Sequence, residues 1–136
     1  SKDISNYRKV FMNELVVGFP IDEGVLGFQT KYDYAAVIPA YKIWKLKRHD
    51  IDVRVLEMIL RSNHMREIYK SKMQGAVDRR RSIPDDVFLA IEIPIPSKDA
   101  VKKIIANHEN LIKAKQSLSD KKSELINTVE TLWLEI

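Results

Sequence analysis

The sequence predicts an α+β fold, in which a small, twisted, mostly antiparallel sheet with one packed helix precedes a long C-terminal helix of coiled-coil type. Short runs of β-branched and aromatic residues, separated by glycine and proline, fill the first fifty positions. An amphipathic helical pattern follows from residue 52 to about residue 73. The last forty residues contain neither glycine nor proline, which favours one uninterrupted helix.

Four short strands are expected before residue 50. Residues 10–11 and 15–17 flank a turn at 12–14. Residues 18–27 hold three of the four glycines, which is typical of a turn-rich surface stretch. Two more strand-like runs follow at 35–39 and 40–46, so the strands lie close together in sequence and favour antiparallel pairing.

The helix near residues 52–73 begins with Asp52 as its expected N-cap and has Gly75 as its stop signal. A bend is expected near Ser62, because serine favours helix ends over helix interiors. Pro84 then predicts one helical turn, and residues 91–95 predict a short strand in which Pro94 lies at an edge or at a strand end. Apolar residues at helical spacing support the first helix: Val55, Leu56, Ile59, Leu60, Ile68 and Tyr69.

The terminal helix is expected over residues 97–136, with Ser97 as its N-cap. One heptad position is apolar throughout, while the other seam position is polar in its middle at His108, Lys115 and Lys122. Forty residues would extend about 60 Å, longer than a body of 96 residues. We therefore expect this helix to pack on unlike helices of a partner, or to form a homo-oligomer, through Ile104, Leu111, Leu118, Leu125, Leu132 and Trp133.

Clustered positive charge makes DNA a candidate partner. The chain has a net charge of +4 and a pI near 9.2. We predict phosphate or base contacts from seven side chains: Arg79, Arg80, Arg81, Lys42, Lys45, Lys47 and Arg48. The alternative is a solvated loop whose arginines pair with Asp78, Asp85 and Asp86. Likewise, Tyr32, Tyr34 and Tyr41 could stack on bases or pack half-buried in the sheet.

Several function classes find no support in the residues. Without cysteine there are no disulfides or thiolate metal sites, and no apolar run approaches a membrane span of about 20 residues. Asp85, Asp86 and Glu92 invite comparison with a metal nuclease, but residue 94 is proline where such sites place a lysine. His49, His64 and His108 are scattered. We expect a cytoplasmic protein that is not an enzyme and uses no cofactor or metal.

The order of several motifs resembles a target-recognition domain from the DNA-specificity subunit of type I restriction-modification enzymes. The motifs are VLEMILRS at 55–62, Gly75, RSIPDDVF at 81–88 and IEIPIPS at 91–97, preceded by GVLG at 24–27 and AVIPAYKI at 36–43. The resemblance implies that residues 1–96 are the C-terminal part of such a domain and that residues 97–136 are its spacer helix. Within it, Arg79 to Arg81 fall in the variable basic loop.

This resemblance implies a non-catalytic subunit that recognises half of a bipartite site in double-stranded DNA and docks on methyltransferase (modification) and restriction subunits. The chain departs from the family in having Ala100 and Val101 where a glutamate–glutamine pair is frequent. It also starts part-way through the domain and with Ser1, so we expect a piece of a longer protein or a half that pairs with another chain. The alternative function is a coiled-coil interaction module without DNA binding.

Overall fold

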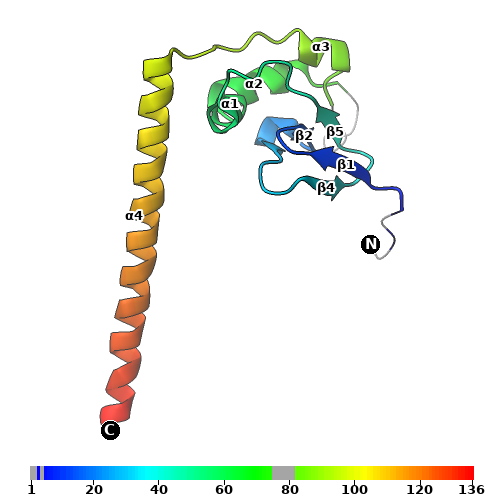
Figure 1. The fold of residues 1–136 in the computed structure, drawn as a ribbon. Coiled ribbons are helices and arrows are strands. Elements are labelled where there is room, and N and C mark those ends of the chain that lie inside the picture. The colour runs from blue at the N-terminus through cyan, green and yellow to red at the C-terminus, as the bar shows by residue number, and fades with distance from the viewer. Residues whose placement is uncertain (1–2, 4, 75–81) are drawn as a thin grey trace. The chain divides into compact units, whose positions relative to one another are not determined.

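The computed structural model describes residues 3, 5–74 and 82–136, and the chain divides into two compact units, Ser1–Ile95 and Pro96–Ile136. The α+β fold is confirmed: short antiparallel strands and short helices make up the first unit, and a long helix makes up the second (Figure 1).

The strands form two small antiparallel sheets. Strand β1 (Arg8–Phe11) pairs with β4 (Tyr34–Val37), and β2 (Leu15–Val17) lies between β3 (Leu26–Phe28) and β5 (Lys42–Trp44). The expected turn at 12–14 is present, with Asn13 in the left-handed region at φ 65°, where asparagine is tolerated better than most residues. This turn carries the chain from one sheet to the other, so β1 and β2 are sequence neighbours in different sheets.

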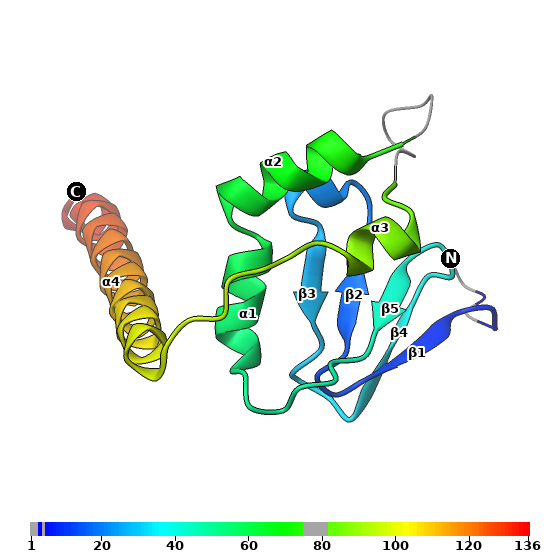
Figure 2. The same ribbon diagram turned by 90° about the horizontal axis from the view of Figure 1, so that it is seen from above.

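The helix expected near residues 52–73 is two helices, α1 (Val53–Leu60) and α2 (Asn63–Lys72). Asp52 is the N-cap of α1, as predicted, and its carboxylate accepts from the Arg54 N–H at 2.9 Å. The break occurs because Ser62 caps a second helix: its hydroxyl accepts from the Met65 N–H at 3.3 Å. In Figure 2, α1 runs alongside β3, the edge strand.

Glu57 on α1 binds the backbone of the edge strand β3. Its Oε1 accepts from the Phe28 N–H at 2.7 Å, and a Cβ added at Gly27 would lie 3.0 Å from the same oxygen. A side chain at residue 27 would therefore push on the Glu57 carboxylate, and glycine leaves room for the close approach of helix and strand. The carboxylate also occupies a backbone donor that an edge strand would otherwise expose.

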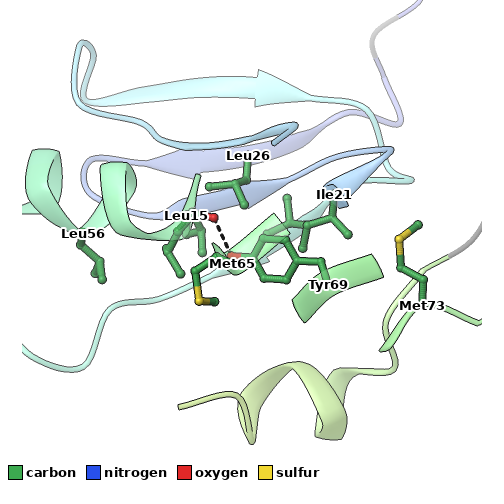
Figure 3. Packing of buried hydrophobic residues seen from close by; sticks show 9 residues of the cluster. Leu15, Ile21, Leu26, Leu56, Met65, Tyr69 and Met73 are labelled. Carbon is green, nitrogen blue, oxygen red and sulfur yellow. Dashed lines mark hydrogen bonds between the residues drawn. The ribbon is translucent and has the colours of Figure 1, made fainter. Parts of the chain in front are cut away.

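The core lies between the three-stranded sheet and the two helices. Tyr69 is completely buried, beside Ile21 and Met65 (Figure 3), and its hydroxyl donates to the Leu60 carbonyl at 2.7 Å. A short 3-10 helix, η1 (Ile21–Glu23), supplies Ile21 and ends at Gly24, whose φ of 80° suits glycine. The remaining buried members of this cluster are Leu15, Val17, Leu26, Leu56, Leu60 and Met73.

The segment after residue 82 partly differs from expectation. The helical turn at Pro84 is confirmed as α3 (Asp85–Leu89), but the strand predicted at 91–95 is wrong, because these residues form no sheet pairing. Pro94 and Pro96 lack N–H donors, and the Ile91 N–H donates to the Phe88 carbonyl at 3.2 Å. Ile91 and Ile93 nevertheless pack half-buried against the core cluster. The alternation of apolar residues in this segment therefore reflects burial and not pairing with a neighbouring strand.

The second unit is helical. Helix α4 (Lys98–Thr131) has 34 residues and continues into a 3-10 turn, η3 (Leu132–Glu135). Ser97 is its N-cap, as predicted, and accepts from the Ala100 N–H at 3.2 Å. None of its residues is buried, so its apolar stripe finds no cover within the described unit.

Candidate nucleic-acid interface

The predicted cations at residues 42–48 lie on β5 and on the segment after it. All four are exposed. Lys42 faces α3, where its Nζ lies 3.4 Å from Asp85 Oδ1. Lys42 also shares a pocket of about 90 Å³ with Ser82. It thus lies beside the residue at which the described chain resumes after the tri-arginine stretch.

Arg79, Arg80 and Arg81 themselves lie outside the described residues. The residues on either side of this stretch are tied together. Gln74 and Ser82 exchange two backbone hydrogen bonds, of 2.9 and 3.0 Å, in an antiparallel bridge. Gln74 and Ser82 therefore lie side by side on the first unit.

Lys45 lines two pockets. With Phe88 and Leu89 of α3 it lines one of about 230 Å³. With His49 it lines another of about 410 Å³, whose lining also includes Phe11 and Met12. Glu14 at the β1–β2 turn is buried, and its Oε1 accepts from the Phe11 N–H at 3.0 Å. This hydrogen bond satisfies one oxygen of the buried carboxylate and holds the turn in shape.

Arg48 is engaged by a neighbour in sequence. Its Nε and its second guanidinium nitrogen donate to the two carboxylate oxygens of Asp50, at 3.1 and 2.8 Å. Hydrogen bonding to Arg48 lowers the pKa of Asp50, and the same bond raises the pKa of Arg48. Both side chains are more than half exposed, so solvent and salt screen the pair and a phosphate can compete for the guanidinium.

The structure therefore gives the cations of the predicted basic cluster different neighbours. Lys42 lies near α3 and Ser82, Lys45 lines pockets beside both α3 and the β1–β2 turn, and Arg48 pairs with Asp50. β5 ends at Trp44, so Lys42 lies on the strand and the other three cations lie on the segment after it. These side chains can contact successive phosphates along a backbone.

Of the three tyrosines, one packs half-buried and two are exposed and could stack on bases. Tyr41 packs half-buried, edge-on to Phe19 with ring centroids 6.0 Å apart. Tyr32 and Tyr34 are exposed by 56% and 58%, which leaves them accessible to a ligand. Each lies under a lysine: Lys9 Nζ is 4.9 Å from the Tyr34 ring centroid, and Lys31 Nζ is 5.4 Å from that of Tyr32.

Sequence reasoning missed the lysines of these two pairs. Lys9 and Lys31 are far apart in the chain, and neither belongs to the basic clusters at residues 42–48 and 79–81. The signal that could have found Lys9 is the alternation on residues 8–11, which sends Lys9 and Phe11 to the face opposite Val10.

The acids near α3 form no metal site. Asp85 and Asp86 occupy the first turn of α3, where they complement the helix dipole. Over residues 3, 5–74 and 82–136, no three side chains of His, Asp or Glu lie close enough to hold a metal ion. Over the same residues, no helix is long and apolar enough to cross a membrane.

The stripe on α4 is the second candidate interface. Leu111, Leu118 and Leu125 are 50%, 54% and 65% exposed, and Trp133 is 66% exposed. Ile104 is half-buried. An apolar row of this length on a helix otherwise polar is typical of a surface that packs on another helix.

Comparisons of the chain with protein-family models, with curated proteins and with solved structures found no match. Function must therefore be argued from the two surfaces described above.

Proposed function

We propose that this chain is a non-catalytic DNA-recognition component, in which the first unit binds double-stranded DNA and α4 assembles with partner subunits. The observation that carries the proposal is the combination of exposed lysines on the α+β unit, at Lys42, Lys45 and Lys47, with a helix whose leucine stripe is exposed. The resemblance of residues 24–97 to type I restriction-modification specificity subunits gives the proposal its class. Methyl transfer and cleavage would belong to the partner methyltransferase and restriction subunits.

The charge pattern supports phosphate contacts spread over a surface. Lys42, Lys45 and Lys47 are exposed, and Lys42 shares a pocket with Ser82 at the end of the tri-arginine stretch. Contacts of this kind fix position on a duplex and make affinity depend on salt. With about four phosphate contacts, affinity would fall about 100-fold between 50 and 200 mM salt.

The helix supports assembly. A homodimer of ideal zipper type is disfavoured, because Lys115 and Lys122 occupy the second seam position at the middle of α4. A partner helix with acids facing these lysines would satisfy them. That requirement favours assembly with an unlike subunit over pairing of two identical parallel helices.

A coiled-coil module that binds no DNA is the second candidate, and the exposure of the α4 stripe favours it equally. Two sets of substitutions separate the candidates. Replacing Arg79, Arg80 and Arg81 by alanine should weaken DNA binding at least about tenfold and leave assembly unchanged. Replacing Leu111, Leu118 and Leu125 by lysine should abolish assembly.

The test measures mass by light scattering after size exclusion, and binding by fluorescence anisotropy with a random duplex of about 30 base pairs at about 50 and 200 mM salt. DNA binding that the arginine variant loses supports recognition of DNA. Assembly without any binding at the lower salt concentration would refute it and leave the interaction module. Because low salt favours even non-specific binding, this condition gives DNA binding its best chance to appear.

A further inference from the structure

The ribbon formed by β1 and β4 has two unlike faces. Val10 is 1% exposed and faces inward with its cross-strand partner Ala35. Successive side chains point to opposite faces of a strand. The outer face therefore carries Lys9, Phe11, Tyr34 and Ala36, all of them exposed.

This outer face joins cations to aromatic rings. Phe11 lies directly opposite Tyr34 in the register, and Lys9 Nζ lies 4.9 Å from the centre of the Tyr34 ring. The neighbouring loop repeats the arrangement with Lys31 over Tyr32, at 5.4 Å. None of the four residues on the outer face is a carboxylate, and Asp33 is the acid of the adjoining loop.

The loop that presents Tyr32 is held in place by hydrogen bonds. The Gln29 side-chain oxygen accepts from the backbone N–H groups of Lys31 and Tyr32, at 2.8 and 2.9 Å, and its amide donates to the Tyr32 carbonyl. The Met12 N–H donates to the Asp33 carbonyl at 3.2 Å, which ties this loop to the β1–β2 turn. A surface ordered before binding loses less entropy when a ligand arrives.

We propose that the β1–β4 ribbon enters the major groove of duplex DNA, with Lys9, Phe11 and Tyr34 against base edges and Lys31 at a flanking phosphate. This proposal rests on the DNA binding proposed above and assigns the element that reads the bases. The major groove admits a two-stranded ribbon, and its base edges offer guanine acceptors to a lysine and thymine methyl groups to apolar and aromatic side chains. Ala36, opposite Lys9, keeps the ribbon narrow on this face.

Charge favours this occupant over a protein surface. A protein partner for exposed aromatic side chains would bury them among apolar groups, where two lysine ammonium groups would be costly. DNA satisfies the rings and the cations together, because its base edges lie between rows of phosphates. The placement of one lysine over each tyrosine therefore fits a DNA groove better than it fits the apolar surface of a protein partner.

Crosslinking tests the placement directly. A random duplex that contains 5-iodouracil carries iodine in the position of the thymine methyl, in the major groove, and irradiation joins it to aromatic side chains in contact. Mass spectrometry of the crosslinked full chain should identify peptides that contain Phe11 or Tyr34. A single strand of the same composition serves as the competitor.

Binding by three variants supplies the second readout. Tyr34→Ala should weaken duplex binding at least about fivefold, and Lys9→Ala should weaken it by a similar factor. Lys113→Ala, at an exposed lysine on α4, is the matched control and should bind as the unmodified chain does. Tyr34→Phe keeps the ring and should retain most of the affinity, and far-ultraviolet circular dichroism checks that each variant folds.

The outcomes separate the two proposals. If the chain binds duplex at low salt while the Lys9 and Tyr34 variants are unaffected and crosslinks map elsewhere, the ribbon assignment fails and DNA binding stands. If crosslinks at Tyr34 form with the single strand but not with the duplex, the major-groove placement is wrong. No binding to duplex at about 50 mM salt overturns both.

Discussion

Replacing Tyr69 by phenylalanine should make the stability of the first unit less sensitive to alkaline pH. The Tyr69 side chain is completely buried, and its hydroxyl donates to the Leu60 carbonyl at 2.7 Å. Burial raises the pKa of Tyr69 from 10.0 to about 12. The neutral phenol is thus favoured in the folded state, and the unfolded chain releases its proton at lower pH.

Two terms set the size of the effect. At neutral pH the substitution removes one hydrogen bond and leaves a carbonyl without that donor, at a cost of about 1 to 3 kcal/mol. A folded pKa raised by about two units contributes stability that is complete below pH 10 and is lost as pH rises through 12, and this loss is about 3 kcal/mol. The phenylalanine variant has no such loss, so the difference in unfolding free energy between it and the unmodified chain should vanish near pH 12.

Urea unfolding at a series of pH values from neutral to about pH 12 measures both terms. A Trp133→Phe background leaves Trp44 as the single tryptophan, so fluorescence then reports on the first unit. Tyr32→Phe, at an exposed tyrosine, is the matched control and should change stability by less than about 0.5 kcal/mol at every pH. If the difference in unfolding free energy between the unmodified chain and the Tyr69→Phe variant stays constant over this whole series, burial of the phenol does not control its titration and the reasoning fails.

Three further substitutions test individual contacts. Ser97→Ala removes the N-cap of α4 and should cost about 1 kcal/mol, seen as faster amide exchange in the first helical turn, whereas Ser97→Asp should retain protection. Glu57→Ala frees the Phe28 N–H and should cost about 1 to 3 kcal/mol in urea unfolding, more than Glu57→Gln, whose oxygen can still accept. Asp52→Asn should reduce the acid sensitivity of unfolding: hydrogen bonding to Arg54 lowers the pKa of Asp52, so its contribution is present above about pH 4 and disappears as pH falls through the folded pKa. Equal acid midpoints for the unmodified chain and the Asp52→Asn variant would contradict this last expectation.

The sequence was most informative where one local interaction decides the structure. Asp52 and Ser97 were recognised as N-caps because a short acceptor before a helical pattern has few other uses. The uninterrupted helix at the C-terminus followed from the absence of glycine and proline in the same way. The two capping bonds join residues two and three positions apart, and such short spacings are visible in a sequence.

Long-range pairing was harder to predict. The strands at 10–11 and 15–17 were expected, but nothing local indicates that β1 would pair with β4 and β2 with β3 and β5. The alternation at 91–95 predicted a strand, whereas Pro94 prevents a ladder and Ile93 packs half-buried against the core without one. Burial and backbone pairing leave the same period-two pattern, so the pattern alone does not separate them.

The candidate interface shows the same limit. Lys42 and Lys45 are close in sequence, but Lys42 lies on β5 and Lys45 on the segment after it, and they line different pockets. Lys9 and Tyr34 were not associated, although the β1–β4 register brings them together. Clusters on a sheet are built across strands, and sequence proximity is a poor guide to them.

The bridge between Gln74 and Ser82 has an evolutionary consequence. It consists of two backbone hydrogen bonds, of 2.9 and 3.0 Å. Any residue that keeps its backbone N–H can form these bonds, so they do not depend on the side chain at either position. Selection can therefore change these two side chains while the link between the segment after α2 and the segment before α3 stays in place.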